Sequence, residues 1–148
     1  MVIALHVAAM FLPSPLTGRL VDTIGRTRMA AASGVTLLLA GLLAASAPDD
    51  SVVLLALALA LLGLGWNFGL VSGTAIVTDA VPLETRARTQ GLVDVSIAIA
   101  GTGAGLASGI VVEATSYSAL SFAGGLLALA IVPAIAASAR SRGPLAPA

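Results

Sequence analysis

The chain has 148 residues, of which 58% are hydrophobic and 9% are charged, and its formal net charge is zero. Ordinary globular domains carry roughly 25% charged residues, so this composition excludes a soluble protein and predicts a membrane protein in contact with the lipid bilayer. A neutral chain gives no reason to expect a nucleic-acid partner. With no cysteine and one histidine, thiolate and multi-histidine metal sites are excluded, and no residue spacing is typical of an enzyme.

Five apolar segments follow one another along the chain, and a membrane span needs about 20 mostly apolar residues. The first segment is slightly short, and the fourth contains one charged residue, Asp94. The predicted spans are residues 1–17, 29–48, 52–78, 91–112 and 117–139, and residues 143–148 are expected to form a disordered tail. We therefore predict an all-α, polytopic membrane protein with five transmembrane helices.

Basic and acidic connections fall on opposite sides of such a five-span arrangement. The first and third connections and the C-terminal tail share one side and contain all seven basic residues, which are arginines at positions 19, 26, 28, 86, 88, 140 and 142. The other two connections carry Asp49, Asp50 and Glu113 and no basic residue. Because basic loops stay in the cytoplasm, we predict a multi-pass protein of the plasma or inner membrane with its N-terminus outside and its C-terminus in the cytoplasm.

The chain begins abruptly inside an apolar run, and its predicted number of spans is odd. We expect this pattern from a truncated or split gene. The alternative is a true start codon followed by a short first helix.

Glycines and prolines mark close packing and bends within the spans. Two sets of glycines recur every four residues, a pattern that lets helix backbones approach closely. These are Gly65, Gly69 and Gly73, and Gly101, Gly105 and Gly109. Pro13 and Pro15 are expected to kink the first span near its cytoplasmic end, and Pro133 the last span.

The connection over residues 18–28 carries a recognisable spacing, Gly-x-Leu-x-Asp-x-x-Gly-Arg-x-Arg. This spacing resembles the loop signature of the major facilitator superfamily (MFS) of transporters, with departures at Thr23 and Thr27, where the family usually has basic residues. Residues 82–91 resemble the family's equivalent cytoplasmic loop between later helices. The resemblance implies that the five spans are helices 8 to 12 of a twelve-helix transporter, without helix 7 and the N-terminal half.

In that family the signature loop latches the two halves together on the cytoplasmic side and releases as they rock. The two glycines would permit a tight turn, and Asp22 and Arg26 would be latch residues, with Glu84, Arg86 and Arg88 as candidate partners. The alternative is that these charges only set the topology. The resulting candidates for latching and gating are Gly18, Asp22, Gly25, Arg26, Arg28, Glu84, Arg86, Arg88 and Asp94. For Asp94 the alternative is a structural role at the helix N-terminus, paired with Arg86 or Arg88.

Polar side chains inside spans are the candidates for substrate contact. Counted at 1.5 Å per residue from the arginine-bearing end, His6, Asn67 and Thr102 each lie roughly 18 Å deep, near the middle of the bilayer. Trp66 at that depth would wall a cavity rather than sit at the interface. The alternatives are that Asn67 bonds a neighbouring helix and that His6 and Trp66 only pack.

The predicted function is therefore membrane transport of a small solute by a secondary transporter that works by alternating access, with this chain supplying part of the cavity. The missing N-terminal half, or a second copy of the chain, would complete the path. No cofactor is expected beyond a possible coupling ion, H⁺ or Na⁺. The alternative is a non-transporting helix-packing membrane protein, or an inactive fragment of a split or truncated transporter gene.

Overall fold

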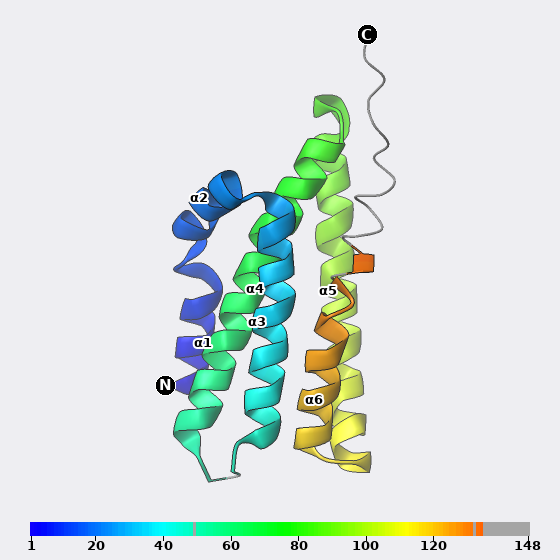
Figure 1. Cartoon of the computed structure of the whole chain (residues 1–148). Helices are drawn as coiled ribbons and strands as arrows, with labels where there is room; N and C mark the ends of the chain where they lie inside the picture. Colours follow the sequence, from blue (N-terminus) through cyan, green and yellow to red (C-terminus); the bar gives the residue numbers. More distant parts are fainter. Residues whose placement is uncertain (49, 132, 135–148) are drawn as a thin grey trace.

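The computed structural model describes residues 1–48, 50–131 and 133–134, and these form helices without any strand (Figure 1). The helices are α1 (Val2–Phe11), α2 (Ser14–Ile24), α3 (Arg26–Ser46), α4 (Val52–Ala80), α5 (Leu83–Ala114) and α6 (Tyr117–Ala128). The predicted all-α class is therefore confirmed for the described part of the chain.

Helices α3 and α4 form the centre of the structure and pack against each other along their length. Helix α1 lies against α4 on one side, and α6 lies against α3 on the other. Helix α5 stands at the far edge, where it makes few contacts with α4 and α6 (Figure 1). The long helices α3, α4 and α5 are each apolar enough and long enough to cross a membrane.

Helices α4 and α5 are longer than one bilayer crossing requires. They contain 29 and 32 residues. At 1.5 Å per residue these helices are about 44 and 48 Å long, against a hydrocarbon core of about 30 Å. Their connection consists of Val81 and Pro82, and α5 begins at Leu83. The prediction that residues 82–91 form a loop is therefore wrong, because α5 already includes residues 83–91.

The first predicted span, residues 1–17, covers α1 and the start of α2, and these two helices are bent by 41° at the break between them. The kink expected at Pro13 is confirmed, because Pro13 is the residue before α2 and has no backbone N–H to continue α1. Helix α2 then continues to Ile24, so the predicted loop over residues 18–28 is wrong for most of its length. Only Gly25 interrupts the helical path there, with a φ of 103° that favours glycine.

Helix α6 represents only the first part of the last predicted span, residues 117–139. It is apolar, contains 12 residues and ends at Ala128. Pro133 lies four residues after Leu129, the residue that follows α6, and a proline ring clashes with the carbonyl four residues before it. The described residues thus contain three helices of spanning length, or four spans when the bent pair counts as one. The expected tail at 143–148 lies outside the described residues.

Three glycines allow the central helices to come close together. A Cβ at Gly63 would lie 2.5 Å from the His6 carbonyl oxygen of α1, and one at Gly41 would lie 2.6 Å from the Ser121 carbonyl oxygen of α6. A Cβ at Gly65 would lie 2.8 Å from the Leu37 side chain of α3. At Gly63 and Gly41 the atoms met belong to the backbone, so a Cβ there would require a helix to move, whereas at Gly65 the Leu37 side chain would have to shift.

The two predicted glycine rows differ in outcome. Gly65 and Gly69 make a close approach as predicted, and the helix they approach is α3, whereas a Cβ at Gly73 would meet nothing within 4 Å. The α5 row is open: a Cβ added to any of its glycines at 101, 105 and 109 would meet no described neighbour within 4 Å. The close contact predicted for that row is not made within the described part of the chain.

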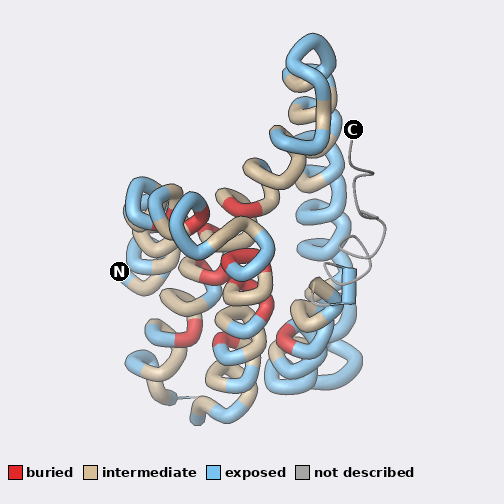
Figure 2. Tube along the Cα trace, turned by 45° about the horizontal axis from the view of Figure 1, so that its top comes forward, coloured by how far each residue is buried: buried red, intermediate tan, exposed pale blue. Residues whose placement is uncertain are grey.

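Buried residues gather in the centre, where α2, α3 and α4 meet, and α5 contains none (Figure 2). The largest fully buried side chains are polar: Asn67, Thr17, Ser33 and Ser72. Buried polar groups need hydrogen-bond partners, and in lipid the lack of a partner costs several kcal/mol. The centre of the structure is therefore held by a polar network as well as by glycine packing.

Candidate functional site

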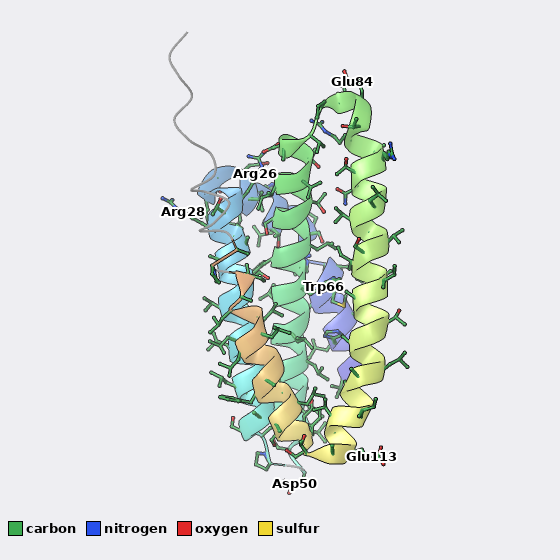
Figure 3. All side chains as sticks on the ribbon, turned by 90° about the vertical axis from the view of Figure 1, so that its right-hand side faces the viewer. Arg26, Arg28, Asp50, Trp66, Glu84 and Glu113 are labelled. Atoms are coloured by element: carbon green, nitrogen blue, oxygen red, sulfur yellow. The ribbon has the colours of Figure 1, made fainter. Side chains whose placement is uncertain are left out.

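The charged residues labelled in Figure 3 lie at the two ends of the helices, and Trp66 lies between them. Arg26, Arg28 and Glu84 are at one end, and Asp50 and Glu113 are at the other. The division of charge predicted along the sequence is thus present in space for these residues.

An ion pair joins the beginning of α3 to the end of α4 at the arginine-bearing end. Nε of Arg26 lies 2.7 Å from Oδ2 of Asp79, and Nη2 donates a hydrogen bond of 3.2 Å to Oδ1. The Nε–H does not point along its short contact, so that contact is Coulombic rather than an aligned hydrogen bond. Both side chains are nearly half exposed, which limits the contribution of the pair to stability.

Arg26 pairs with Asp79 and not with Glu84, the acidic residue among the candidate partners predicted for the latch residues Asp22 and Arg26. Asp79 was not predicted as a site residue. It was missed because Arg26 and Asp79 are 53 residues apart in the sequence. They meet only because α3 and α4 pack antiparallel, which brings the start of α3 next to the end of α4. Asp22 is exposed on α2 and forms no ion pair within the described ranges.

Asp94 accepts a hydrogen bond of 3.0 Å from Nε2 of Gln90, one turn earlier in α5. Within the part of the chain that the structure describes, it does not pair with Arg86 or Arg88, so that predicted pairing is not formed. Two polar atoms near the start of α5 are shielded from solvent and have no hydrogen-bond partner among the described residues. They are Nε of Arg86 and Oε1 of Gln90. Glu84 and Arg88 are exposed at the same end.

Asn67 binds the break between α1 and α2. Its side-chain nitrogen donates to the Met10 carbonyl oxygen and to the Ser14 hydroxyl, both at 2.8 Å. Its side-chain oxygen accepts a hydrogen bond of 2.5 Å from the Thr17 hydroxyl. Both amide hydrogens are therefore used within the protein, and the residue is only 1% exposed. This geometry favours the alternative in which Asn67 bonds a neighbouring helix.

Ser33 and Gly65 form a second polar link between the central helices. The Ser33 hydroxyl donates a hydrogen bond of 2.7 Å to the Gly65 carbonyl oxygen. Ser33, Ser14 and Thr17 were not predicted as site residues. The four-residue spacing of Thr17 and Val21, both buried on α2, was a signal that this segment is a helix with one face turned inward.

His6 lies on α1 and faces α4. Its Nδ1 is 2.7 Å from the Leu59 carbonyl oxygen. Leu59 precedes Asn67 by eight residues, which corresponds to about 12 Å along α4. The backbone of His6 is nearer to Asn67, because its carbonyl oxygen lies against Gly63, four residues before Asn67. The common depth of His6 and Asn67 in the bilayer stays a prediction.

Trp66 is the central residue of α4, with fourteen residues of the helix on each side. It borders three adjoining hollows of about 220, 280 and 570 Å³, and Leu37 borders all three as well. We call these hollows together the Trp66 recess. The smallest is lined by His6, Met10, Leu37, Leu62 and Trp66. His6 and Trp66, which were predicted separately, thus share one hollow.

Residues of α3, α4, α5 and α6 line the largest hollow of the recess. They include Ala58 of α4, Ala104 of α5 and Tyr117 of α6, and most of the lining is apolar. Thr102 lies outside the lining of the three hollows: it is exposed on α5, and its hydroxyl donates to the Ala98 carbonyl oxygen of its own helix at 2.9 Å. The structure therefore brings together two of the four substrate candidates, His6 and Trp66. Asn67 instead bonds the break between α1 and α2, and neither Asn67 nor Thr102 lines the recess.

No group of three or more histidine, cysteine, aspartate or glutamate residues that could hold a metal ion occurs in the described ranges. The recess offers planar and aliphatic surface, an imidazole and an indole. These groups can enclose an uncharged molecule, and they are not arranged for acid–base or nucleophilic chemistry.

Comparison with known proteins agrees with this arrangement. The family model described as Major Facilitator Superfamily matches residues 1–147. Two proteins of Bacillus subtilis (strain 168), named as the uncharacterized MFS-type transporters YdeG and YddS, are 56% and 57% identical to the chain over 135 residues. These matches cover 91% of this chain and 31% of each relative. The chain thus spans about a third of the length of these curated relatives.

A more distant relative is the riboflavin transporter RfnT of Brucella anthropi. It is 38% identical over 89 residues, which are 60% of this chain and 22% of that protein. No solved structure matches the chain. The family consists of membrane transporters rather than enzymes, in keeping with the apolar helices and the recess. The match along almost the whole chain shows that this protein belongs to the major facilitator superfamily.

Proposed function

We propose that this chain forms most of the C-terminal half of a secondary transporter, helices 8 to 12, and that the complete protein moves a small solute across the cell membrane by alternating access. The arginine-bearing end would face the cytoplasm, and a gradient of H⁺ or Na⁺ would drive transport. The path would be completed by the missing N-terminal half or by a second copy of the chain. Family membership and the division of charge between the two ends support this proposal.

The observation that carries the proposal is the Trp66 recess. It lies at the midpoint of α4, and substrate sites of transporters lie near the bilayer midplane between helices. Its lining is apolar apart from a few neutral polar groups, which favours an uncharged, amphipathic solute. Riboflavin, which the relative RfnT is named for, carries a planar uncharged ring system of this kind, so such molecules are the first substrates to test.

Asn67 would act in this transporter by positioning the broken helix rather than by touching the solute. Its amide holds Met10, Ser14 and Thr17, which lie on both sides of the break. Met10 also lines the recess, so the bond connects the break to the wall of the proposed site. Thr102 on α5 would contact solute only if segments outside the described chain bring it to the path.

The Arg26–Asp79 pair would serve as the latch within this half. It joins α3 to α4 next to Gly25, the residue with positive φ at which the chain turns from α2 into α3. The remaining candidates lie at the same end and would pair with the missing half as the cytoplasmic side closes. They are Asp22, Arg28, Glu84, Arg86, Arg88 and Asp94, with Gly18 allowing close approach of α2.

Alternating access is tested most simply with a single cysteine, because the chain contains none. The matching 135 residues of a cysteine-free YdeG are replaced by this chain, and Leu62→Cys is introduced in the recess. We expect a membrane-impermeant maleimide to label this cysteine from either side of oriented vesicles. The control Leu39→Cys, exposed on α3 outside the recess, should stay unlabelled in lipid. Labelling of Leu62→Cys from one side only, under all gradients, would contradict the proposal.

Uptake by the chain alone separates the proposal from its alternative. In proteoliposomes, the YdeG chimera should accumulate one of a panel of uncharged amphipathic solutes that includes riboflavin, whereas the 148-residue chain alone should not. Uptake by the isolated, monomeric chain would show that no second half is required. A folded chimera without uptake or two-sided labelling would favour a non-transporting helix-packing protein.

A further inference from the structure

We propose that His6 accepts a hydrogen bond from the ligand. The recess would thereby select uncharged planar molecules whose edge carries an N–H or O–H group. This inference rests on the proposed function for its biological role, because it names the ligand class of the same recess. It concerns binding alone, so it is tested without transport.

The bond to Leu59 sets the tautomer of His6. A backbone carbonyl oxygen can only accept a hydrogen bond, so the ring nitrogen at 2.7 Å from it must carry the hydrogen. In a neutral imidazole one nitrogen carries the hydrogen and the other is an acceptor. Nδ1 is therefore the donor, and Nε2 is left with its lone pair.

The free acceptor belongs to a residue that lines the smallest hollow of the recess. Within the described ranges, Nε2 has no hydrogen-bond partner in the protein, and it is not among the polar atoms shielded from solvent. The other lining residues are Met10, Leu37, Leu62 and Trp66, none of which can accept a strong hydrogen bond through its side chain. A ligand N–H or O–H that enters this hollow thus finds one strong side-chain acceptor.

The indole of Trp66 supplies the planar surface next to that acceptor. Trp66 is 39% exposed, so part of its ring is available to a ligand. Flat aromatic molecules gain stacking and dispersion contacts on such a ring, and Met10 adds a polarisable sulfur. A hollow of about 220 Å³ suits a small fused ring rather than a long chain. Trp66 would therefore contact the planar body of the ligand, and His6 would accept the hydrogen bond from its edge, within the same hollow.

The fluorescence of Trp66 reports binding directly, because it is the only tryptophan in the chain. The probes are theophylline and caffeine, two uncharged planar xanthines that differ in one position, where the N–H of theophylline is an N-methyl group in caffeine. With the chain in lipid nanodiscs, we expect theophylline to quench the fluorescence saturably and to bind about fivefold more tightly than caffeine. That ratio corresponds to one net neutral hydrogen bond of about 1 kcal/mol.

Two substitutions separate the two ring nitrogens of His6. The amide of asparagine in His6→Asn replaces Nδ1 and can still donate to Leu59, but it leaves no group at the position of Nε2. The amide of glutamine in His6→Gln reaches the position of Nε2 and offers an acceptor oxygen there. The preference for theophylline should fall to about onefold in His6→Asn and be retained at least twofold in His6→Gln.

Several results would overturn the inference. One is equal affinity of theophylline and caffeine in the unaltered chain, and another is an unchanged preference in His6→Asn. A third is the absence of saturable quenching by either probe. None of these results bears on two-sided labelling of Leu62→Cys or on solute uptake, so failure of this inference is distinguishable from failure of the proposed transport function.

Discussion

Helices α4 and α5 are both long and apolar, yet they are held in opposite ways. Side chains or carbonyl groups of α4 bind His6 of α1, Thr17 of α2, and Ser33 and Arg26 of α3. In α5, by contrast, the side-chain hydrogen bonds go to its own helix or to Pro82, the residue before it. Helix α4 contributes five buried residues and α5 contributes none.

This difference shows which helices are stabilised by contacts with one another within the described residues. An apolar helix is stable in lipid without neighbours, because its backbone groups are bonded internally. The exposure of α5 is therefore tolerated in a membrane, and its open glycine row leaves room for close packing by segments outside the described chain. Helices α1 to α4 instead form a unit, which we call the α1–α4 block, whose glycines and polar groups are already matched to each other.

Gly63→Ala should have the largest effect on the α1–α4 block. The added Cβ would lie 2.5 Å from the backbone oxygen of His6, so α1 would have to move away from α4. We expect a loss of about 1–3 kcal/mol in the free energy of unfolding, as for overpacking elsewhere. Thermal unfolding in detergent, followed by circular dichroism, measures this loss.

The matched control is Gly105→Ala in α5, where a Cβ meets nothing within 4 Å. It should leave the unfolding transition unchanged or slightly raised, since alanine favours a helix over glycine. Equal destabilisation by the two substitutions would remove the distinction between the α1–α4 block and α5.

Asn67→Leu should have the next largest effect, because it leaves the Met10 carbonyl oxygen and the Ser14 and Thr17 hydroxyls without their shared partner. We expect a loss of about 1–2 kcal/mol. A double-mutant cycle with Thr17→Val should show coupling between the two residues. The control is Thr102→Val, whose hydroxyl bonds only its own helix. Additive effects of Asn67→Leu and Thr17→Val would show that the bond seen between them contributes nothing.

Arg26→Gln should have the smallest effect on stability. The pair with Asp79 is nearly half exposed on both sides, so its loss should cost less than about 1 kcal/mol and should become undetectable in high salt. A cycle with Asp79→Asn measures the coupling, and Arg28→Gln is the control for loss of a nearby positive charge. Coupling that does not change with salt would mean that the pair is more shielded than its exposure indicates.

The sequence was sufficient for the helical class, the segregation of charge and the family, because each depends on composition and spacing along the chain. It misjudged residues 18–28, where glycines and charges suggested a loop although Thr17 and Val21 already share one buried helix face. The bend of the first span was predicted at Pro13, because a proline ring cannot continue the helix before it, whereas its angle of 41° follows only from the structure.

Individual residues of the candidate site were predicted from the sequence, but their positions relative to one another were not. His6 and Trp66 were identified because polar and aromatic side chains are unusual in the middle of a span. Their common hollow, and the bonds of Asn67 to the broken helix, depend on how α1 and α4 pack. That packing is set by Gly63, whose importance follows only from what a side chain there would meet.

The central claim is that the α1–α4 block keeps its own geometry, whereas α5 acquires its place from segments outside this chain. It is tested most directly by distances between spin labels in lipid nanodiscs, placed on cysteines at exposed positions. One pair, Leu39→Cys and Leu57→Cys, joins α3 and α4, and the other, Leu57→Cys and Leu106→Cys, joins α4 and α5. The α3–α4 distribution should be narrow and the same in the chain alone and in the YdeG chimera. The α4–α5 distribution should be broad in the chain alone and narrow in the chimera, and a narrow α4–α5 distribution that is identical in both would contradict the account.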